Sequence, residues 1–480
     1  MALHLISILG TSLYEPVYYE TKDRKDQFVQ SAMVRKFQDQ LKKENARVSI
    51  LLTNDARAKN WEDREYNDSD KKPMSRGNEE SKPQITRIKK GLKTTLMEEF
   101  SEEIRTKDVD IPDGKNQKEL MQIFEKIYQM INENEEIVFD VTHGFRSLPF
   151  LVMSVLQYAK TLKHCKVKGI FYGAYEARKE NGDVVPIIDL TVYDEIIEWS
   201  FAAKQFSSYG NARPMSELYD SLDMARKTES LTNIVEKAEQ LASTINMSRG
   251  SAIGVKEAKY PEKQSIKIAF EKFQNTDLDG SEESRIPPLE ELIVYMKKRY
   301  EVLENEKNYT IGMAVVRLCI EFEMINQGFT ALEETLITYL CEMNSLDDMD
   351  RADRDIAEKV VGSLIAFVRK NRKDSVGDQR YASVFWNFLI NENPESKEAI
   401  GAADNADRKK YEMISCFLTK DENHSIEFGK IADTIKNDRN DVNHFGMRKK
   451  PLSYEVLQKH LKNYYEKLYE LMDLMSAENV

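Results

Sequence analysis

The chain has 480 residues, of which 41% are hydrophobic and 32% are charged, and its formal net charge is −12. This length is too great for one ordinary core and favours two or three domains. The acidic balance argues against a protein that coats nucleic acid non-specifically, although an RNA substrate can still bind in a basic cleft of an acidic protein.

The cysteines and the first residues of the chain indicate the cellular compartment that the sequence suits. The four cysteines lie far apart and form no CxxC pair, which argues against a zinc site or a disulfide framework and suits a reducing cytoplasm. No basic segment precedes the first apolar run, so we expect no signal peptide. No apolar stretch approaches the ~20 residues of a membrane span. We therefore expect a cytoplasmic protein without a membrane partner.

The first two hundred residues predict strands that alternate with helices. Near-continuous apolar runs predict buried strands at 3–9, 48–53 and 137–141. Helical spacing of apolar residues predicts helices at about 27–44, 84–100 and 117–132. The polar stretch 55–83, with two prolines and a glycine, predicts a long surface loop.

The end of this segment predicts a helix and a hairpin. Ser147 as N-cap and Pro149 in the first turn are typical of a helix start. Apolar runs at 167–175 and 184–192 flank Asn181-Gly182, the strongest short signal for an antiparallel hairpin. We therefore expect an α/β, Rossmann-like amino-terminal domain whose mostly parallel sheet ends in an antiparallel hairpin.

Helical periodicity dominates from about Tyr193 onward, and strand signals almost vanish. Helices are expected at 214–246, 288–305, 310–344, 355–371, 409–420 and 453–475. The sequence thus predicts an α/β domain at 1–195, a helical connector at 196–300 and an all-α domain at 301–480.

Three polar loops are expected at one edge of the sheet, where parallel strands end and ligands bind. The candidate ligand-binding residues in these loops are Gly10, Thr11, Ser12, Asn54, Thr142, His143, Gly144, Arg146 and Ser147. Gly144 permits close approach of the backbone, and a helix amino terminus at Ser147 offers N–H groups to a phosphate. Arg146 adds a charged clamp. The loops form neither a GxGxxG nor a GxxxxGK[ST] motif, which disfavours dinucleotide redox chemistry and ATP hydrolysis.

The segment 140–149 (DVTHGFRSLP), with LGTS at 9–12 and Tyr14, resembles the CRISPR-associated DxTHG-motif proteins of type III systems. The resemblance implies a CARF domain, a dimeric sensor of cyclic oligoadenylate. Thr11, Ser12, Thr142, His143, Gly144 and Arg146 would then line the pocket of the ring. Cyclic tetra-adenylate is expected in preference to cyclic hexa-adenylate, as an allosteric activator rather than a cofactor.

Many sensors of this family carry a carboxyl-terminal HEPN ribonuclease domain with an Arg-x4–6-His motif. Arg439 and His444 match it with four intervening residues, and Asn440 is the polar residue that commonly follows the arginine. The resemblance implies an endoribonuclease of antiviral defence that acts on single-stranded RNA, in which two such motifs face each other across the axis of a homodimer or higher even-numbered oligomer.

The residue types suit RNA cleavage without a metal ion. The 2′-OH of RNA attacks the adjacent phosphorus, so the enzyme must move protons and stabilise charge. A histidine can exchange protons at neutral pH, and an arginine can hold the non-bridging oxygens. Positions five apart on a helix differ by roughly 140°. The helix is therefore expected to begin or bend between Arg439 and His444, or a second chain completes the site.

Two alternatives stay open at this point. The chain could be a non-catalytic sensor, such as a transcription regulator, whose helical part binds DNA or a protein. It could also be a ring nuclease that degrades its activator in the CARF pocket, with His143 as a candidate base. No pair of histidines has metal-binding spacing, so no metal site is expected.

Overall fold

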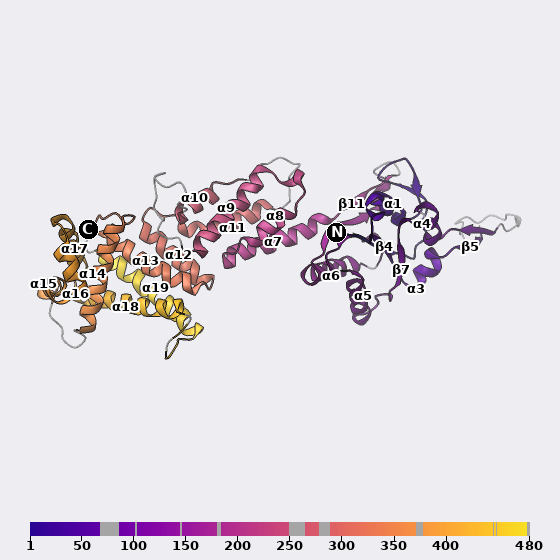
Figure 1. Ribbon diagram of the computed structural model, residues 1–480. Coiled ribbons are helices and arrows are strands. Elements are labelled where there is room, and N and C mark those ends of the chain that lie inside the picture. The colour runs from indigo at the N-terminus through magenta and orange to yellow at the C-terminus, as the bar shows by residue number, and fades with distance from the viewer. Residues whose placement is uncertain are drawn as a thin grey trace. The chain divides into compact units, whose positions relative to one another are not determined.

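The computed structural model describes residues 1–67, 86–100, 103–144, 146–179, 184–248, 265–277, 289–370, 378–444, 446–447 and 449–477. The chain divides into two compact units, Met1–Ile197 and Glu198–Val480, coloured from indigo to yellow in Figure 1. The predicted helical connector (196–300) and all-α domain (301–480) both fall, but for the first two residues, in the second unit. The boundary between them after residue 300 therefore stays a prediction.

The amino-terminal unit is built on a six-stranded sheet of order β11-β9-β8-β1-β4-β7. In chain order the strands are β1 (Leu3–Leu9), β4 (Arg47–Leu52), β7 (Thr106–Asp110), β8 (Glu136–Asp140), β9 (Lys166–Gly173) and β11 (Ile187–Asp189). Every neighbouring pair is parallel except β11 with β9. This confirms the predicted Rossmann-like sheet with an antiparallel end, while the Asn181-Gly182 turn lies outside the described residues.

Helices cover both faces of this sheet because successive side chains of a strand point to opposite sides. From β1, Leu5 and Leu9 pack with α1 (Val29–Lys36) and α4 (Leu92–Phe100). Ile6 and Ile8 pack on the other side with α5 (Gln117–Met130) and α6 (Leu148–Lys163). The strands therefore read as continuous apolar runs, buried on both faces.

The predicted surface loop at 55–83 is wrong in its first part. A turn of helix, α3 (Asn54–Ala56), continues into a π-helical turn, η1 (Arg57–Trp61). Strand β5 (Arg64–Asn67) then pairs antiparallel with β6 (Thr86–Lys89). The helix expected at 84–100 consequently begins only at Leu92. Trp61 anchors the segment because its side chain is buried among α1 and α4 residues.

Two smaller elements differ from expectation in the same unit. The helix expected at 27–44 is divided into α1 and α2 (Gln38–Leu41), because Phe37 between them has non-helical backbone angles. A second sheet, unpredicted, contains β10 (Val184–Val185), β2 (Val17–Tyr19) and β3 (Lys25–Asp26).

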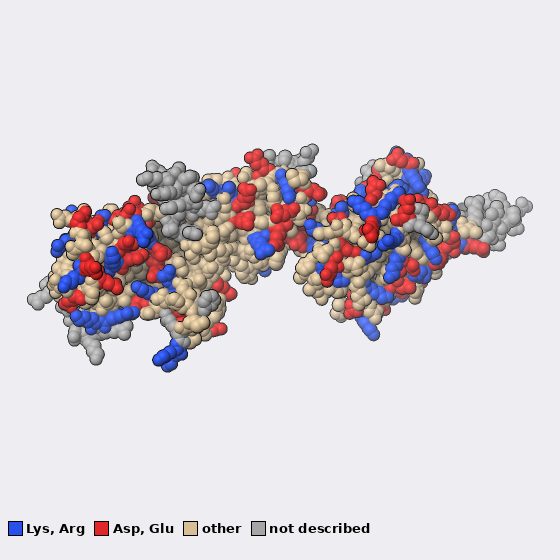
Figure 2. All heavy atoms as spheres, viewed as in Figure 1, with Lys and Arg blue, Asp and Glu red and all other residues tan. Residues whose placement is uncertain are grey.

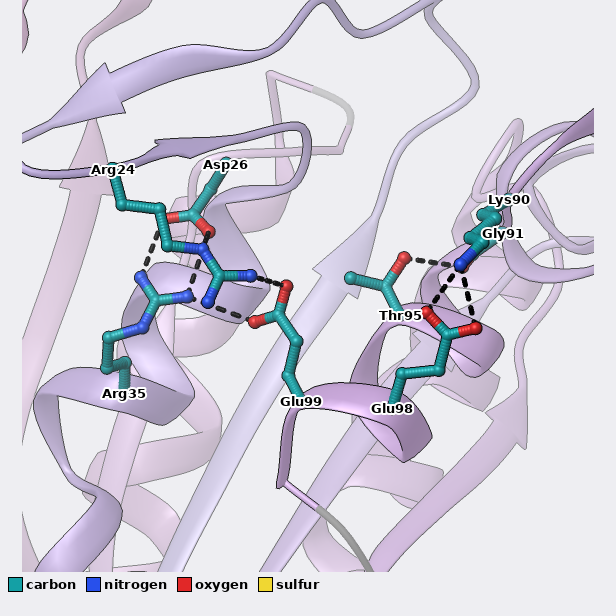
Figure 3. A network of polar contacts seen from close by, with 8 residues as sticks. All are labelled: Arg24, Asp26, Arg35, Lys90, Gly91, Thr95, Glu98 and Glu99. Carbon is teal, nitrogen blue, oxygen red and sulfur yellow. Dashed lines mark hydrogen bonds and ion pairs between the residues drawn. The ribbon is translucent and has the colours of Figure 1, made fainter.

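Ion pairs join β3, α1 and α4 on one face of this unit (Figure 3). Arg35 donates to both oxygens of Asp26, at 2.7 and 2.9 Å, and to Glu99 at 3.0 Å. Arg24 pairs with the same two acids. A bidentate arginine on a buried carboxylate fixes the entry into α1 more firmly than an exposed pair would.

A second polar group is buried at the amino ends of the strands. His4 hydrogen-bonds Ser49 at 2.8 Å and lies 3.4 Å from Glu135, which Arg47 also binds. Burial opposes ionisation of Glu135. Hydrogen bonds from His4 and the Asn132 backbone, with the Arg47 charge, outweigh it and lower the pKa of Glu135 to about 2. This group gives His4 a structural role at the amino ends of the strands.

The second unit is all-α in its described residues, as predicted. Its helices are α7 (Thr191–Tyr209), which begins in the first unit, α8 (Arg213–Ser221), α9 (Glu229–Asn246), α10 (Ile266–Gln274), α11 (Leu289–Tyr300), α12 (Asn308–Glu321), α13 (Ile325–Met343), α14 (Arg351–Lys370), α15 (Asp378–Asn387), α16 (Pro394–Ala402), α17 (Asn405–Leu418), α18 (Glu422–Asn443) and α19 (Tyr454–Ala477). The expected helices 214–246 and 310–344 are each divided in two, and the sequence did not predict α7, α10, α15, α16 or α18.

Two apolar cores hold this unit together. One is formed mainly by α7 to α12 and the other by α13 to α19, and α12 contributes to both. None of the described helices is long and apolar enough to cross a membrane.

Candidate functional site

The first candidate site lies where β8, β1 and β4 end side by side. Leu9 pairs with Leu52, and Ser7 pairs with Asp140, so the three following loops emerge at one edge. From β1 the chain proceeds to β4 on one side and returns later to β8 on the other. A parallel sheet binds ligands at such a reversal of strand order.

Asp140 holds the turn after β8 from inside the protein. Its fully buried carboxylate accepts the Ser7 hydroxyl at 2.6 Å and the Thr142 backbone N–H at 3.0 Å. The Thr142 hydroxyl also donates to Asp140 and accepts the Gly173 N–H at 2.8 Å. Because this hydroxyl donates one hydrogen bond to β8 and accepts another from β9, Thr142 fixes the loop to both strands.

A residue that the sequence did not indicate holds the loop after β1. The buried Asn60, in η1, donates its side-chain amide to the carbonyls of Gly10 at 2.9 Å and Ser12 at 2.8 Å. The side chains of Thr11 and Ser12 are exposed. A buried amide thus fixes the loop backbone while its hydroxyl side chains face solvent.

The loops after β1 and β8 meet at His143. The Tyr14 and His143 rings lie 4.6 Å apart between centroids, and a Cβ on Gly10 would come within 3.2 Å of the His143 Cβ. Burial lowers the pKa of His143, although the Asp140 charge opposes this, and burial raises the pKa of Tyr14. Both side chains therefore favour their neutral forms, which suits stacking and hydrogen bonding rather than charge pairing.

The rest of the DxTHG turn exposes backbone. Gly144 has a φ of +135°, a region that only glycine adopts readily. Arg146 and Ser147 are exposed, and Phe145 lies outside the described residues. Pro149 occupies the first turn of α6 as predicted. The N-cap prediction for Ser147 is wrong in one respect, because its side chain makes no capping hydrogen bond.

Asn54 completes the predicted set. It is an exposed residue in the first turn of α3, directly after β4, and Thr53 caps that turn by accepting the Ala56 N–H at 3.2 Å. The structure thus brings Gly10 and His143 into close proximity, and it leaves Asn54 at the same edge. Among the described residues, no cluster of acidic, histidine and cysteine side chains could hold a metal ion.

The second candidate site is the carboxyl end of α18. The helix runs unbroken through Arg439 and Asn440 and ends at Asn443, with His444 as its C-cap. Neither a start nor a bend separates the motif residues, contrary to two of the three expectations. His444 still donates its backbone N–H to the Asn440 carbonyl at 3.1 Å, so its position continues the helix and the roughly 140° separation from Arg439 applies. His444 is exposed, whereas Arg439 and Asn440 are half-buried.

Arg439 lies against α13. Its Nη1 is 3.0 Å from Oε2 of Glu333, which is itself half-buried. Burial raises the pKa of Glu333, although the charges of Arg439 and Lys436 oppose this. The Glu333 carboxylate therefore already pairs with the Arg439 guanidinium, the group to which a phosphate oxygen would also bind.

The acids of this helix end are turned inward. Asp438 and Asp441 are buried, whereas Lys436, Lys449 and Lys450 are exposed. The surface at this end is consequently more positive than its formal charge suggests. Elsewhere, Figure 2 shows acidic and basic side chains interspersed on the face in view, without one large basic patch.

Asp438 connects α18 to α19. Its Oδ2 accepts His460 Nδ1 at 2.9 Å and the Tyr464 hydroxyl at 3.0 Å. Asp441 accepts the Leu452 backbone N–H at 3.0 Å and so ties back the loop between the helices. The sequence indicated neither Glu333 nor His460, since both are distant from the motif along the chain.

Comparisons with known proteins were made for the whole chain. Residues 4–176 match the family described as "CRISPR system endoribonuclease Csx1, CARF domain". CRISPR-associated protein MJ1674 of Methanocaldococcus jannaschii is 25% identical over 259 residues, which are 54% of this chain and 37% of that protein. Csm6 of Enterococcus italicus, solved bound to cyclic hexa-2'-fluoro-hexa-dAMP, is 12% identical with a TM-score of 0.43, covering 100% of this chain and 95% of that one.

The family match covers the whole of the first candidate site, from β1 to the residues after β9. The MJ1674 match spans little more than a third of that relative. The resemblance predicted from the DxTHG motif is thereby confirmed: residues 4–176 match the Csx1 CARF-domain family, and 259 residues of the chain are similar to a CRISPR-associated protein.

Proposed function

We propose that this protein is an endoribonuclease of type III CRISPR antiviral defence that cyclic oligoadenylate activates and that cleaves single-stranded RNA. The observation that carries the proposal is the end of α18, where the half-buried Arg439 and the exposed His444 lie on a surface whose acids are buried. The family's name adds support, because Csx1 is described as an endoribonuclease.

The proposed activator site is the edge formed by Gly10, His143 and Gly144. A neutral imidazole against Tyr14 offers a stacking surface for a base, and the backbone at Gly144 and the start of α6 offers N–H groups to phosphate. A cyclic ligand on a two-fold axis suits an isologous homodimer. It shifts the protein towards an active arrangement only if it binds that arrangement more tightly.

The proposed chemistry needs no metal ion. Arg439 would hold the non-bridging oxygens as charge develops on the phosphorane, and His444 would exchange a proton with the reacting oxygens. Asn440, half-buried on the same turn, would orient the substrate. The products would carry a 2′,3′-cyclic phosphate and a 5′-OH, and a second copy of the chain would contribute the same residues.

The test uses pure protein, labelled single-stranded RNA and EDTA, with cyclic tetra-adenylate, cyclic hexa-adenylate or neither. Cleavage is expected only with an activator, and His444→Ala should abolish it. His424→Ala is the matched control, because His424 lies on the same helix near Asp421, far from Arg439. Absence of cleavage with both activators would refute the proposal and favour a non-catalytic sensor.

One observation favours a second activity, degradation of the activator in the CARF pocket. Burial keeps His143 towards its neutral form, in which an imidazole can accept the proton of a ribose 2′-OH. Loss of the cyclic ligand in the same reactions, abolished by His143→Ala and retained in His444→Ala, would support it. A cyclic ligand that stays intact would rule it out.

A further inference from the structure

Asp438 gathers two side chains of α19 around one buried carboxylate oxygen. His460 Nδ1 lies 2.9 Å and the Tyr464 hydroxyl 3.0 Å from Oδ2 of Asp438. The Asp438 side chain is 10% exposed, whereas that of His460 is 36% exposed. The imidazole therefore has its Nδ1 edge held inside and its other edge open to solvent.

This arrangement prepares a histidine for proton transfer. A carboxylate at Nδ1 fixes the orientation and tautomer of the ring and leaves Nε2 as the acceptor in the neutral ring. Tyr464 supplies a second donor to the carboxylate, so Asp438 is held in place independently of the histidine. Within the described residues, Nε2 of His460 makes no hydrogen bond, and it is free to meet a substrate.

The ring lies at the same end of the helix pair as the Arg-x4-His motif. Asp438 directly precedes Arg439, and His444 lies six positions after it, a rise of about 9 Å. The loop from His444 to α19 is tied back by the Asp441–Leu452 hydrogen bond. His460 contacts Asp438, the residue before Arg439, so its ring lies at that level of α18, about 9 Å along the helix axis from His444.

We propose that His460 is a second proton-transfer residue of the ribonuclease site, an inference that rests on the proposed function. His460 Nε2 takes the proton of the 2′-OH as O2′ attacks phosphorus and the P–O2′ bond forms. The P–O5′ bond breaks with its electron pair on O5′, and a protonated His444 donates its proton there. Proton count and charge balance, because one histidine gains a proton and the other loses one. Asp438 acts as a positioning residue through His460.

The first test compares His460→Asn with His424→Asn, both in the full chain with EDTA and activator. General base catalysis contributes typically ~10²- to 10⁴-fold. We therefore expect His460→Asn to lower kcat at least ~100-fold with little change in KM, and His424→Asn to match the unsubstituted chain. Asp438→Asn should lower kcat less than His460→Asn, while Tyr464→Phe keeps the imidazole–carboxylate pair and most of the activity.

The second test separates base from acid with an RNA whose scissile 5′-oxygen is replaced by sulfur. A thiolate leaves without a proton, so this substrate should restore cleavage by His444→Ala but not by His460→Asn. Equal restoration of both variants would overturn the assignment of His460 as base. Helical circular dichroism of each variant, unchanged from that of the unsubstituted chain, shows that a lost rate is not a lost fold.

The two proposals fail in different ways. If the unsubstituted chain cleaves RNA and His444→Ala does not, while His460→Asn behaves as His424→Asn does, the ribonuclease proposal stands and the role of His460 is refuted. If the unsubstituted chain cleaves nothing with either cyclic activator, both are refuted.

Discussion

The buried carboxylate of the DxTHG turn should matter for activator binding without touching the activator. Asp140→Asn keeps the size of the side chain and removes its charge. The matched control is Asp189→Asn, because Asp189 accepts the Thr191 N–H at 2.8 Å and the Thr191 hydroxyl in the same local pattern. Asp189 is exposed, whereas Asp140 is fully buried.

The expected cost follows from the partners of Asp140. Two hydrogen bonds from Thr142 change from charge-assisted to neutral, at about 1 kcal/mol each. The Ser7 hydroxyl already accepts a hydrogen bond from Gln30 Nε2 at 3.1 Å, so its own proton must point to residue 140. In Asp140→Asn the amide NH2 can lie there, and two donors would then face each other. That mismatch costs about 1–2 kcal/mol, and the total is about 3 kcal/mol.

Hydrogen exchange measures this cost locally in the full chain. A loss of about 3 kcal/mol corresponds to roughly 100-fold faster exchange through opening of β8 and β1. Calorimetric titration with cyclic tetra- and hexa-adenylate should show weaker binding by Asp140→Asn, at least ~10-fold, and no more than ~2-fold change for Asp189→Asn. If Asp140→Asn and Asp189→Asn show the same protection from hydrogen exchange and the same affinity for the activator, the scaffolding role of Asp140 is refuted.

Three further outcomes are expected. Gly144→Ala should weaken activator binding in the same titration at least ~10-fold, because its φ is +135° and the added methyl would clash with the Leu148 side chain. Glu135, whose pKa of about 2 lies below the usual 4.5, stabilises the fold fully above pH ~4.5 and loses that contribution as the pH falls towards 2. Glu135→Gln should therefore cost about 3 kcal/mol at pH 7 and flatten the acid side of a stability–pH curve from urea unfolding, and an unchanged slope there would contradict this. Glu333→Gln should lower KM for RNA several-fold by freeing Arg439 for phosphate, whereas Glu334→Gln, which frees a different arginine, should leave KM unchanged.

The sensor fold was predictable because its signals are local and apolar. Strands β1, β4 and β8 are buried on both faces and so appear as apolar runs. Edge strand β7 (TKDVD) has exposed side chains and gave no such signal. The DxTHG site was likewise contiguous in sequence, whereas Asn60, which holds the neighbouring loop, lies in a stretch whose polarity indicated only a surface loop.

Helix α18 was missed for a related reason. Three of its buried residues are aspartates, Asp433, Asp438 and Asp441, so its inward face does not show the apolar spacing of an ordinary amphipathic helix. Each of these acids has its partner on a different segment, as with the ion pair between Asp433 and Arg369 of α14. Pairings of this kind are set by tertiary packing, and no spacing within one helix can indicate them.

Both candidate sites use their acids in the same way. Asp140 and Asp438 are buried and fully engaged in holding other side chains, and neither is placed to meet a ligand. Asp140 holds Thr142, the neighbour of His143 in the amino-terminal unit, and Asp438 holds His460 itself in the helical unit. A buried carboxylate costs stability unless hydrogen bonds compensate for its lost hydration. The position of each acid is therefore explained by the side chain that it holds in place. Substituting Asp438 should therefore reduce function through His460, with the His460 variant setting the lower limit of activity, whereas substituting Asp140 should act through the loop that Thr142 holds.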